Sequence, residues 1–355
     1  MRFMSLLLPL AASAATTSDT DDLCVYPGTC QAPDPDAYKY ISGRLTAVPR
    51  DQWVDSGGFC GAVSIQTLAL TYGAYISQDL IRKAAPDGGG HGDEDEGYEI
   101  STTNIGAALD NLQLLHEAFD ENTPKPQGRA YLAWMKKQLT SNFGIVQFVI
   151  CQGDGHNVAP DGEEPIVFDH IEPFFKLYSQ HPPTDETVYP DDVVVHASDY
   201  GPDGEDNFGY FREFSTLLDT TDMEGNCAEA GDQWKQNEMF PCIYFNETYG
   251  TAIQGVKPCN KGSFKGKVTV PVNLLIDSIS EPDLRSGAFP VEFHGSLVIE
   301  NNSSANHTCY RFDGTEAYAE GRFSKTFEIE KQYEDPAPIM SDSAVYYSCF
   351  SQGRE

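Results

Sequence analysis

A glycine-rich turn leading into an apolar helix decides the fold expected for this chain. It reads Asp51-Gln52-Trp53-Val54-Asp55-Ser56-Gly57-Gly58-Phe59-Cys60-Gly61-Ala62. The segment from Cys60 to Tyr72 is apolar on nearly every face, which is typical of a helix buried at the centre of a domain. The turn therefore delivers a cysteine to the N-terminus of a buried helix.

This position suits a nucleophilic thiol. A helix N-terminus carries partial positive charge and unpaired N–H groups, and both favour the thiolate form of a cysteine. The flanking glycines let a substrate backbone approach closely. Gln52 lies eight residues upstream of Cys60, and its side-chain amide can point to the same place as the Cys60 N–H. Two such donors would form an oxyanion hole for acyl transfer.

The hydrophobic period changes further along the chain. Two more helices are predicted by apolar residues at helical spacing, namely Ile105, Leu109, Leu112 and Leu115, and then Leu132, Met135 and Leu139. Short apolar runs of strand type follow at 144–150, 166–171 and 193–196. Helices followed by strands predict the α+β class for this part of the chain.

The last part of the chain has a different pattern. Short strand-like runs separated by turn residues occur at 267–272, 289–293, 296–299, 324–329 and 344–347. About ninety residues of this kind predict a small, all-β, sandwich-like domain. We therefore expect two globular domains, an α+β domain at 39–261 and the β domain at 262–355.

The first residues indicate export from the cytoplasm. Arg2 precedes a short apolar run, and Ala12-Ser13-Ala14 supplies small residues for cleavage, which is the order of a signal peptide at 1–14. Residues 15–38 are rich in Thr, Asp and Pro and are expected to form a linker or a short leader. The mature protein is expected outside the cell, or in a vacuolar or lysosomal lumen, and free of the membrane.

Sequons and cysteines agree with this route. N-x-Ser/Thr sequons begin at Asn246, Asn301, Asn302 and Asn306, so we expect a glycoprotein. The chain has nine cysteines, so four disulfides would leave one free thiol. The suggested pairs are Cys24–Cys30, Cys227–Cys242 and Cys309–Cys349. Cys60 is the expected free thiol, although a disulfide at Cys60 and a free Cys151 remain an alternative.

The net charge excludes one class of partner. It is −31 at pH 7, and the sequence pI is about 4.4. Such a surface repels phosphate backbones, so nucleic-acid binding is not expected. The acidic charge serves solubility, or else it favours basic substrates or an acidic compartment.

The turn, the helix and two later segments together resemble the papain-like cysteine peptidase superfamily. The likeness is closest to the branch of peptidases that remove double-glycine leaders during bacteriocin export. Phe168-Asp169-His170-Ile171-Glu172-Pro173 is similar to the segment that carries the family's histidine, and Asp199 to the acid after the next strand. The resemblance covers roughly residues 45 to 215. It implies a triad of Cys60, His170 and Asp199, with Gln52 in the oxyanion hole.

Other residues compete for these roles. His91, His156 and His196 are alternative bases, and His156 is the most serious of them. Asp169 is the chain neighbour of His170, so the two side chains leave a strand on opposite faces, and Asp169 is a poor orienting partner. Asp191 and Asp192 are fallback candidates for the acid.

The expected activity is hydrolysis of peptide bonds through a Cys60 thioester. The partners are then peptide or protein substrates, and the chemistry needs no metal or organic cofactor. Two alternatives remain open. One is a transpeptidase or amidase that uses the same triad. The other is a non-enzymatic secreted binding protein on a degenerate peptidase fold.

Overall fold

The structure is a computed structural model of the 355-residue chain. It describes residues 34–43, 52, 58–88, 92–94, 97–120, 122–123, 128–149, 170–198, 208–215, 250–265, 267, 272–277, 292–293, 296–301, 305–335, 339–340 and 343–351. The signal peptide, most of the expected linker, Asp199, two sequons (Asn246 and Asn302) and five cysteines (24, 30, 151, 227 and 242) lie outside these residues. The described part is mixed α+β, with five α-helices and several antiparallel sheets, which confirms the expected class.

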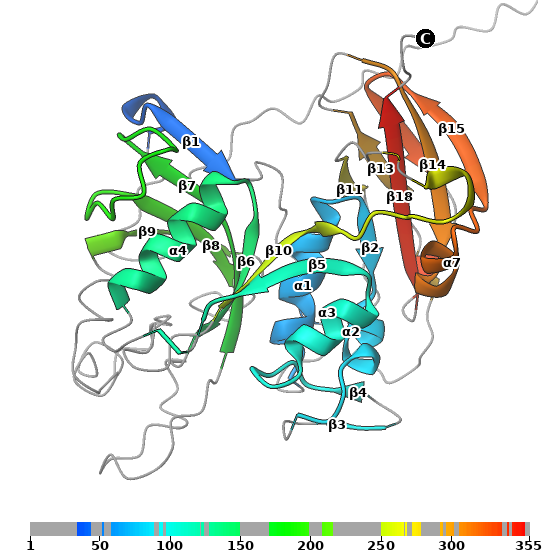
Figure 1. The fold of residues 1–355 in the computed structure, drawn as a ribbon, viewed down its shortest axis with the longest axis horizontal. Helices are drawn as coiled ribbons and strands as arrows, with labels where there is room; N and C mark the ends of the chain where they lie inside the picture. Colours follow the sequence, from blue (N-terminus) through cyan, green and yellow to red (C-terminus); the bar gives the residue numbers. More distant parts are fainter. Residues whose placement is uncertain are drawn as a thin grey trace, which may run out of the picture.

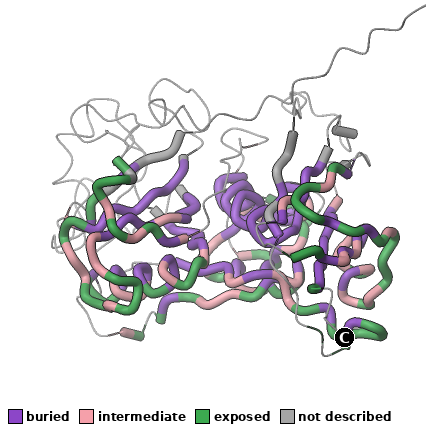
Figure 2. Tube along the Cα trace, turned by 90° about the horizontal axis from the view of Figure 1, so that it is seen from above, coloured by how far each residue is buried: buried purple, intermediate pink, exposed green. Residues whose placement is uncertain are grey.

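Helix α1 (Cys60–Leu70) lies between the two main groups of strands in Figure 1. All eleven of its residues are buried, and the buried segments gather around the middle of the molecule in Figure 2. The expected central helix is therefore confirmed. Its polar residues are satisfied internally: the Gln66 side chain, for example, donates to the carbonyl of Ile76 at 2.9 Å.

The largest sheet has seven antiparallel strands. Six follow the order β5 (Leu114–Ala118), β10 (Gly250–Val256), β6 (Gly144–Val149), β7 (His170–Ser179), β8 (Val193–Ser198) and β9 (Phe208–Glu213). The seventh, β1 (Tyr40–Gly43), pairs with the second half of β7. Short 3₁₀ helices occur at Pro35–Ala37 and Gly262–Phe264.

Helices cover both faces of this sheet. Helix α1 contacts β6, β7 and β10, and helix α4 (Gly128–Thr140) packs on β6 and β7. Ile171 and Phe175 of β7 belong to the same hydrophobic cluster as Cys60. Phe174 of β7 belongs to a second cluster with Leu132 of α4. Because strand side chains alternate, α1 and α4 lie on opposite faces.

Smaller elements surround the N-terminal end of α1. Helix α2 (Gln78–Ala84) begins after Ser77, whose side chain accepts the N–H of Leu80 at 3.3 Å. Two short strands, β3 (Gly92–Asp93) and β4 (Gly97–Tyr98), form a hairpin whose second strand contacts α2. Helix α3 (Ile105–Asn111) then leads into β5.

The expectation that Leu115 continues a helix is wrong. Helix α3 ends at Asn111, and Gln113 has a left-handed backbone with φ of 59°. The chain then turns into β5, which pairs with β10, and Leu115 is 38% exposed. Pairing with a strand some 140 residues later overrides the local helical period.

The C-terminal region is β-rich, as expected. One sheet has the order β15 (Lys325–Ile329), β14 (His307–Asp313), β18 (Ala344–Ser351) and β2 (Ala74–Ile76). A second has the order β11 (Asn273–Asp277), β13 (Ser296–Glu300) and β16 (Gln332–Asp335), and β12 (Glu292–Phe293) pairs with β17 (Ile339–Met340). Helix α7 (Thr315–Glu320) follows β14, so the expectation that this region is all-β is wrong. Strand β2 comes from the segment just after α1, so the N-terminal part of the chain contributes to this sheet.

The cysteines are only partly as expected. The pair Cys309–Cys349 is confirmed, and its disulfide joins directly opposed residues of β14 and β18. Cys60 is a free thiol, which removes the alternative in which it forms a disulfide. The expectation of a single free thiol is wrong, because Cys259 is also free.

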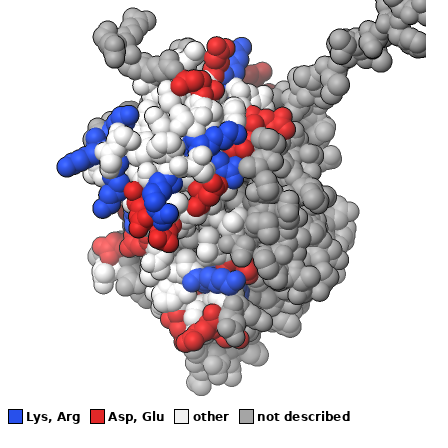
Figure 3. Space-filling model, turned by 90° about the vertical axis from the view of Figure 1, so that its right-hand side faces the viewer, with Lys and Arg blue, Asp and Glu red and all other residues white. Residues whose placement is uncertain are grey.

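Charges of both signs are mixed on the face shown in Figure 3. Within helix α7 and the turn after it, Arg322 pairs with Glu316 at 3.2 Å and with Glu320 at 2.5 Å. These contacts are exposed to solvent, so they stabilise the fold by little.

Candidate active site

Cys60 is the first residue of α1, and its side chain is almost enclosed. The residue is 5% exposed and its thiol is free. The N-cap residue, Phe59, makes no side-chain hydrogen bond to the helix. The N–H groups of the first turn are therefore not capped by that side chain, and their partial positive charge lies beside the thiol.

The peptide plane between Phe59 and Cys60 is fixed by the helix. The carbonyl of Phe59 accepts the N–H of Val63 at 2.9 Å, so it points along the helix axis. In a trans peptide the N–H points opposite to the carbonyl. The Cys60 N–H is therefore directed out of the helix N-terminus, which is the direction that an oxyanion donor requires.

The first turn of α1 is tied to the first residues of β7. The buried Ser64 hydroxyl lies 2.8 Å from the carbonyl of Cys60 and 3.1 Å from the carbonyl of Ile171, and it can donate to either. Ile171 directly follows His170, the first residue of β7. This contact brings the main chain at Cys60 close to the main chain at His170. Ser64 was missed in the sequence, although a hydroxyl inside an apolar helix is a signal that it has a specific partner.

Gly61 allows this close approach. A Cβ atom at this position would lie 2.5 Å from Cβ of Ile100 and 3.0 Å from Cδ1 of Ile171. Both neighbours are buried side chains that cannot easily move away. A glycine after Cys60 is therefore required by packing in addition to any role toward substrate.

We predict that Gly61→Ala lowers the free energy of unfolding by about 1–3 kcal/mol, because the added methyl group overpacks this contact. Gly106→Ala is the matched control. It also lies in a helix, but its new Cβ would meet only Cε1 of His116, at 3.6 Å. The control is expected to be neutral or stabilising by about 0.5–1 kcal/mol. Chemical denaturation of both variants measures the difference, and equal effects would contradict the packing argument.

The other expected site residues are placed only in part. His170 begins β7, but its side chain lies outside the described residues, as does the whole of Asp199. Strands β7 and β8 are antiparallel, with Phe174 opposite His196. The end of β8, at Ser198, therefore lies beside the start of β7. Gln52 is partly buried, and the chain between it and Gly58 is not described.

One rival base, His196, is engaged elsewhere. Its Nδ1 lies 2.6 Å from Oε2 of Glu172, and both residues are buried. Its ring lies against Phe174, with centroids 4.6 Å apart. Phe174 packs on the α4 face of the sheet, opposite Cys60, so His196 is not placed to serve this thiol. The other alternative bases, His91 and His156, lie outside the described residues, as does Cys151, the alternative free thiol.

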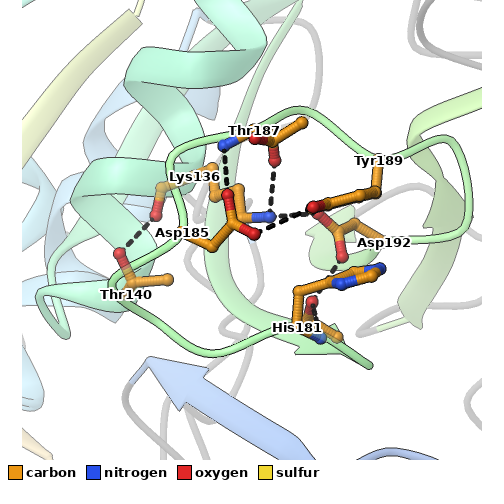
Figure 4. A network of polar contacts seen from close by, with 8 residues as sticks. Lys136, Thr140, His181, Asp185, Thr187, Tyr189 and Asp192 are labelled. Atoms are coloured by element: carbon orange, nitrogen blue, oxygen red, sulfur yellow. Dashed lines mark hydrogen bonds and ion pairs between the residues drawn. The ribbon is translucent and has the colours of Figure 1, made fainter.

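Asp192 is wrong as a fallback acid. Figure 4 shows its carboxylate in a network with Lys136 of α4, at 2.7 Å, and the Ser179 hydroxyl donates to the same carboxylate at 2.5 Å. Ser179 ends β7, nine residues after His170, so Asp192 lies roughly 30 Å from the start of that strand. Its neighbour Asp191 is exposed at this same end.

The same network orders the loop between β7 and β8. The carboxylate of Asp185 accepts the N–H of Thr187 at 3.0 Å and the hydroxyl of Tyr189 at 2.8 Å (Figure 4). These hydrogen bonds lower the pKa of Asp185 to about 2, and the bond from the Thr187 backbone has the largest effect. The loop contacts that depend on the Asp185 carboxylate therefore persist in acid until the pH approaches 2.

Comparisons of this chain with known families, with curated proteins and with solved structures found no match. Among the described residues, no helix is long and apolar enough to cross a membrane. Within the same residues, no group of three or more His, Cys, Asp or Glu side chains is arranged to hold a metal ion.

Proposed function

We propose that this protein is a secreted cysteine peptidase of the papain-like type, with Cys60 as nucleophile and His170 as its base. One observation supports this proposal above the others. A free thiol begins the central helix, and the first turn of that helix is bonded through Ser64 to the start of the strand that carries His170. The fold proposed with it is a papain-like domain at 39–261 and a sandwich-like domain at 262–355.

The proposed reaction is acyl transfer to the thiol. The Cys60 thiolate attacks the carbonyl carbon of a peptide bond, while the Cys60 N–H and the Gln52 amide hold the oxyanion. The C–N bond breaks as His170 protonates the leaving amine. His170 then removes a proton from water, which attacks the thioester and releases the acid and the thiol. Asp199 orients the imidazole through its far ring nitrogen. A transpeptidase or amidase would differ only in the acceptor or in the leaving group.

One observation favours the rival function, a secreted binding protein on a peptidase-like fold. The Cys60 residue is only 5% exposed and packs with Phe59 and Ile100 in the hydrophobic cluster. A nucleophile must be reached by the substrate carbonyl, whereas a purely structural thiol needs no access. Strand alternation adds to this, because position 170 of β7 has the parity of Phe174, which packs on the α4 face, whereas Ile171 packs on the α1 face with Cys60. This counts against His170 as the base, so its role must be tested directly.

Labelling with an irreversible epoxysuccinate probe, mapped by mass spectrometry, separates these functions. We expect the probe to modify Cys60 in the purified mature protein and not to modify Cys259, which is equally buried and also free. Labelling of Cys60 should collapse in His170→Ala and persist in Cys259→Ala. Failure of the probe to label Cys60, with the protein folded, would remove the enzyme proposal and leave the binding protein.

Secretion makes a separate prediction about the two described sequons. Asn306 is exposed, whereas Asn301 is 8% exposed and its amide nitrogen donates to Ala305 at 2.8 Å and to Glu330 at 2.7 Å. Glycosylation of Asn301 would replace one of these amide hydrogens and force a sugar into the fold. After expression in a eukaryotic secretory host, we expect a glycan on Asn306, lost in Asn306→Gln, and none on Asn301. Glycopeptide mapping that finds Asn301 occupied in folded protein would contradict this.

A further inference from the structure

A buried arginine from α2 holds the turn that precedes Cys60. Arg82 lies in the last turn of α2 and is 2% exposed. Its Nη1 donates to the carbonyl of Gly58 at 2.7 Å, and its Nη2 donates to the carbonyl of Gly97 in β4 at 3.1 Å. Its guanidinium carbon also lies 4.5 Å from the centre of the Phe59 ring. One side chain thus contacts the two residues directly before Cys60.

The turn at Gly58 needs such an anchor. Gly58 has φ of +72°, a left-handed backbone that glycine adopts without strain. The Glu99 side chain lies close to this glycine, and a Cβ at Gly58 would stand 2.8 Å from its Cδ. Glycine fits this space, but its flexibility leaves the direction of the next peptide undetermined. A charged donor on the Gly58 carbonyl fixes that peptide plane and, through it, the entry of the chain into α1.

We infer that Arg82 is a positioning residue for Cys60. It holds the Gly58–Phe59 peptide so that the thiol and the Cys60 N–H keep the geometry needed for acyl transfer, and it couples this turn to the β3–β4 hairpin through Gly97. The inference rests on the proposed function of Cys60. A planar guanidinium reaches two carbonyls and stacks on an aromatic ring together, whereas a lysine ammonium is a compact charge on a flexible stem.

The experiment compares Arg82→Gln and Arg82→Lys with Arg322→Gln, which removes an arginine that is 61% exposed. Two readouts are measured on folded full-length protein, with thermal unfolding as the check on folding. The first is the rate at which the epoxysuccinate probe labels Cys60, which needs an activated site. The second is hydrogen exchange of the peptide covering residues 58–63, which reports the order of the turn without any catalysis.

Arg82→Gln is expected to slow labelling by roughly 10-fold to 100-fold, since a small misplacement of a reacting group has effects of this size. Its 58–63 amides should exchange faster than in the wild type. Arg82→Lys should restore part of both readouts, and Arg322→Gln should change neither. Arg82→Lys has the smaller effect on packing. If Arg82→Gln does not fold, the labelling rate and the exchange rate of Arg82→Lys are compared with those of the wild type instead.

Two results would overturn the inference. They are a folded Arg82 variant that labels at the wild-type rate, and one whose turn exchanges as slowly as the wild type. A wild type that the probe does not label is a different result. It removes the proposed function, and the exchange measurement alone then decides whether Arg82 holds the turn.

Discussion

Replacing His170 by alanine is expected to lower kcat/KM for a peptide substrate by about 10²-fold to 10⁴-fold, the usual range for loss of a general base. Cys60→Ala should remove activity altogether, because no thioester can form. The effect of His170→Ala should fall on kcat, since the imidazole acts on the reacting atoms and does not bind the substrate chain. The substrate for this assay comes from profiling a peptide library with the wild-type protein.

His181→Ala is the matched control for this prediction. His181 lies on the loop after β7 and stacks on Tyr189, with ring centroids 3.4 Å apart, at the end of β7 remote from Cys60. Its removal should leave kcat within a few fold of the wild type. If His170→Ala also kept that rate while Cys60→Ala lost it, another group would be the base, and the proposed triad would be wrong.

Replacing Lys136 by alanine is expected to lower the free energy of unfolding by about 3–5 kcal/mol, because it leaves a buried carboxylate without its partner. Lys136 is 1% exposed and Asp192 is fully buried, with 2.7 Å between Nζ and Oδ2. The ammonium also donates to the carbonyl of Thr187 at 2.7 Å and lies 4.7 Å from the centre of the Tyr189 ring. This cation therefore links α4 to the β7–β8 loop (Figure 4).

Lys137→Ala is the control, because this neighbouring lysine is exposed. Its effect should stay within about 0.5 kcal/mol. A double variant, Lys136→Met with Asp192→Asn, should recover most of the loss, since it removes both charges and keeps most of the volume. Urea denaturation of the four proteins tests this. A Lys136→Ala variant as stable as Lys137→Ala would show that the pair does not hold the loop.

Part of the candidate site follows from local sequence. The placement of Cys60 at a helix N-terminus needs only the glycines before it and the apolar residues after it, and both are properties of one short segment. Ser64 and Arg82 could not be assigned in the same way. Their partners, Ile171 and Gly58, lie 107 and 24 residues away, so only the folded chain shows what each side chain contacts.

The rival histidine illustrates the same limit. His196 lies on a strand beside Asp199 in the sequence, which made it a reasonable alternative base. Its exclusion depends on which face of the sheet it occupies and on its bond to Glu172, 24 residues earlier. A strand pattern predicts that side chains alternate, but it does not predict which helix covers each face.

The sequence by itself determined the elements with strong local patterns. These are the buried helix α1, the amphipathic helix α4 and strands such as β6, β13 and β18, because hydrophobic period and turn residues act within a few positions. The sequence only suggested the pairing of Cys309 with Cys349, and the structure confirms it, because the two residues lie directly opposite each other on β14 and β18. Only the tertiary structure decided that Leu114–Ala118 is a strand beside β10 and that β2 joins the C-terminal sheet. Both depend on hydrogen bonds between segments far apart in the chain, and such pairing leaves no period in the sequence of either segment.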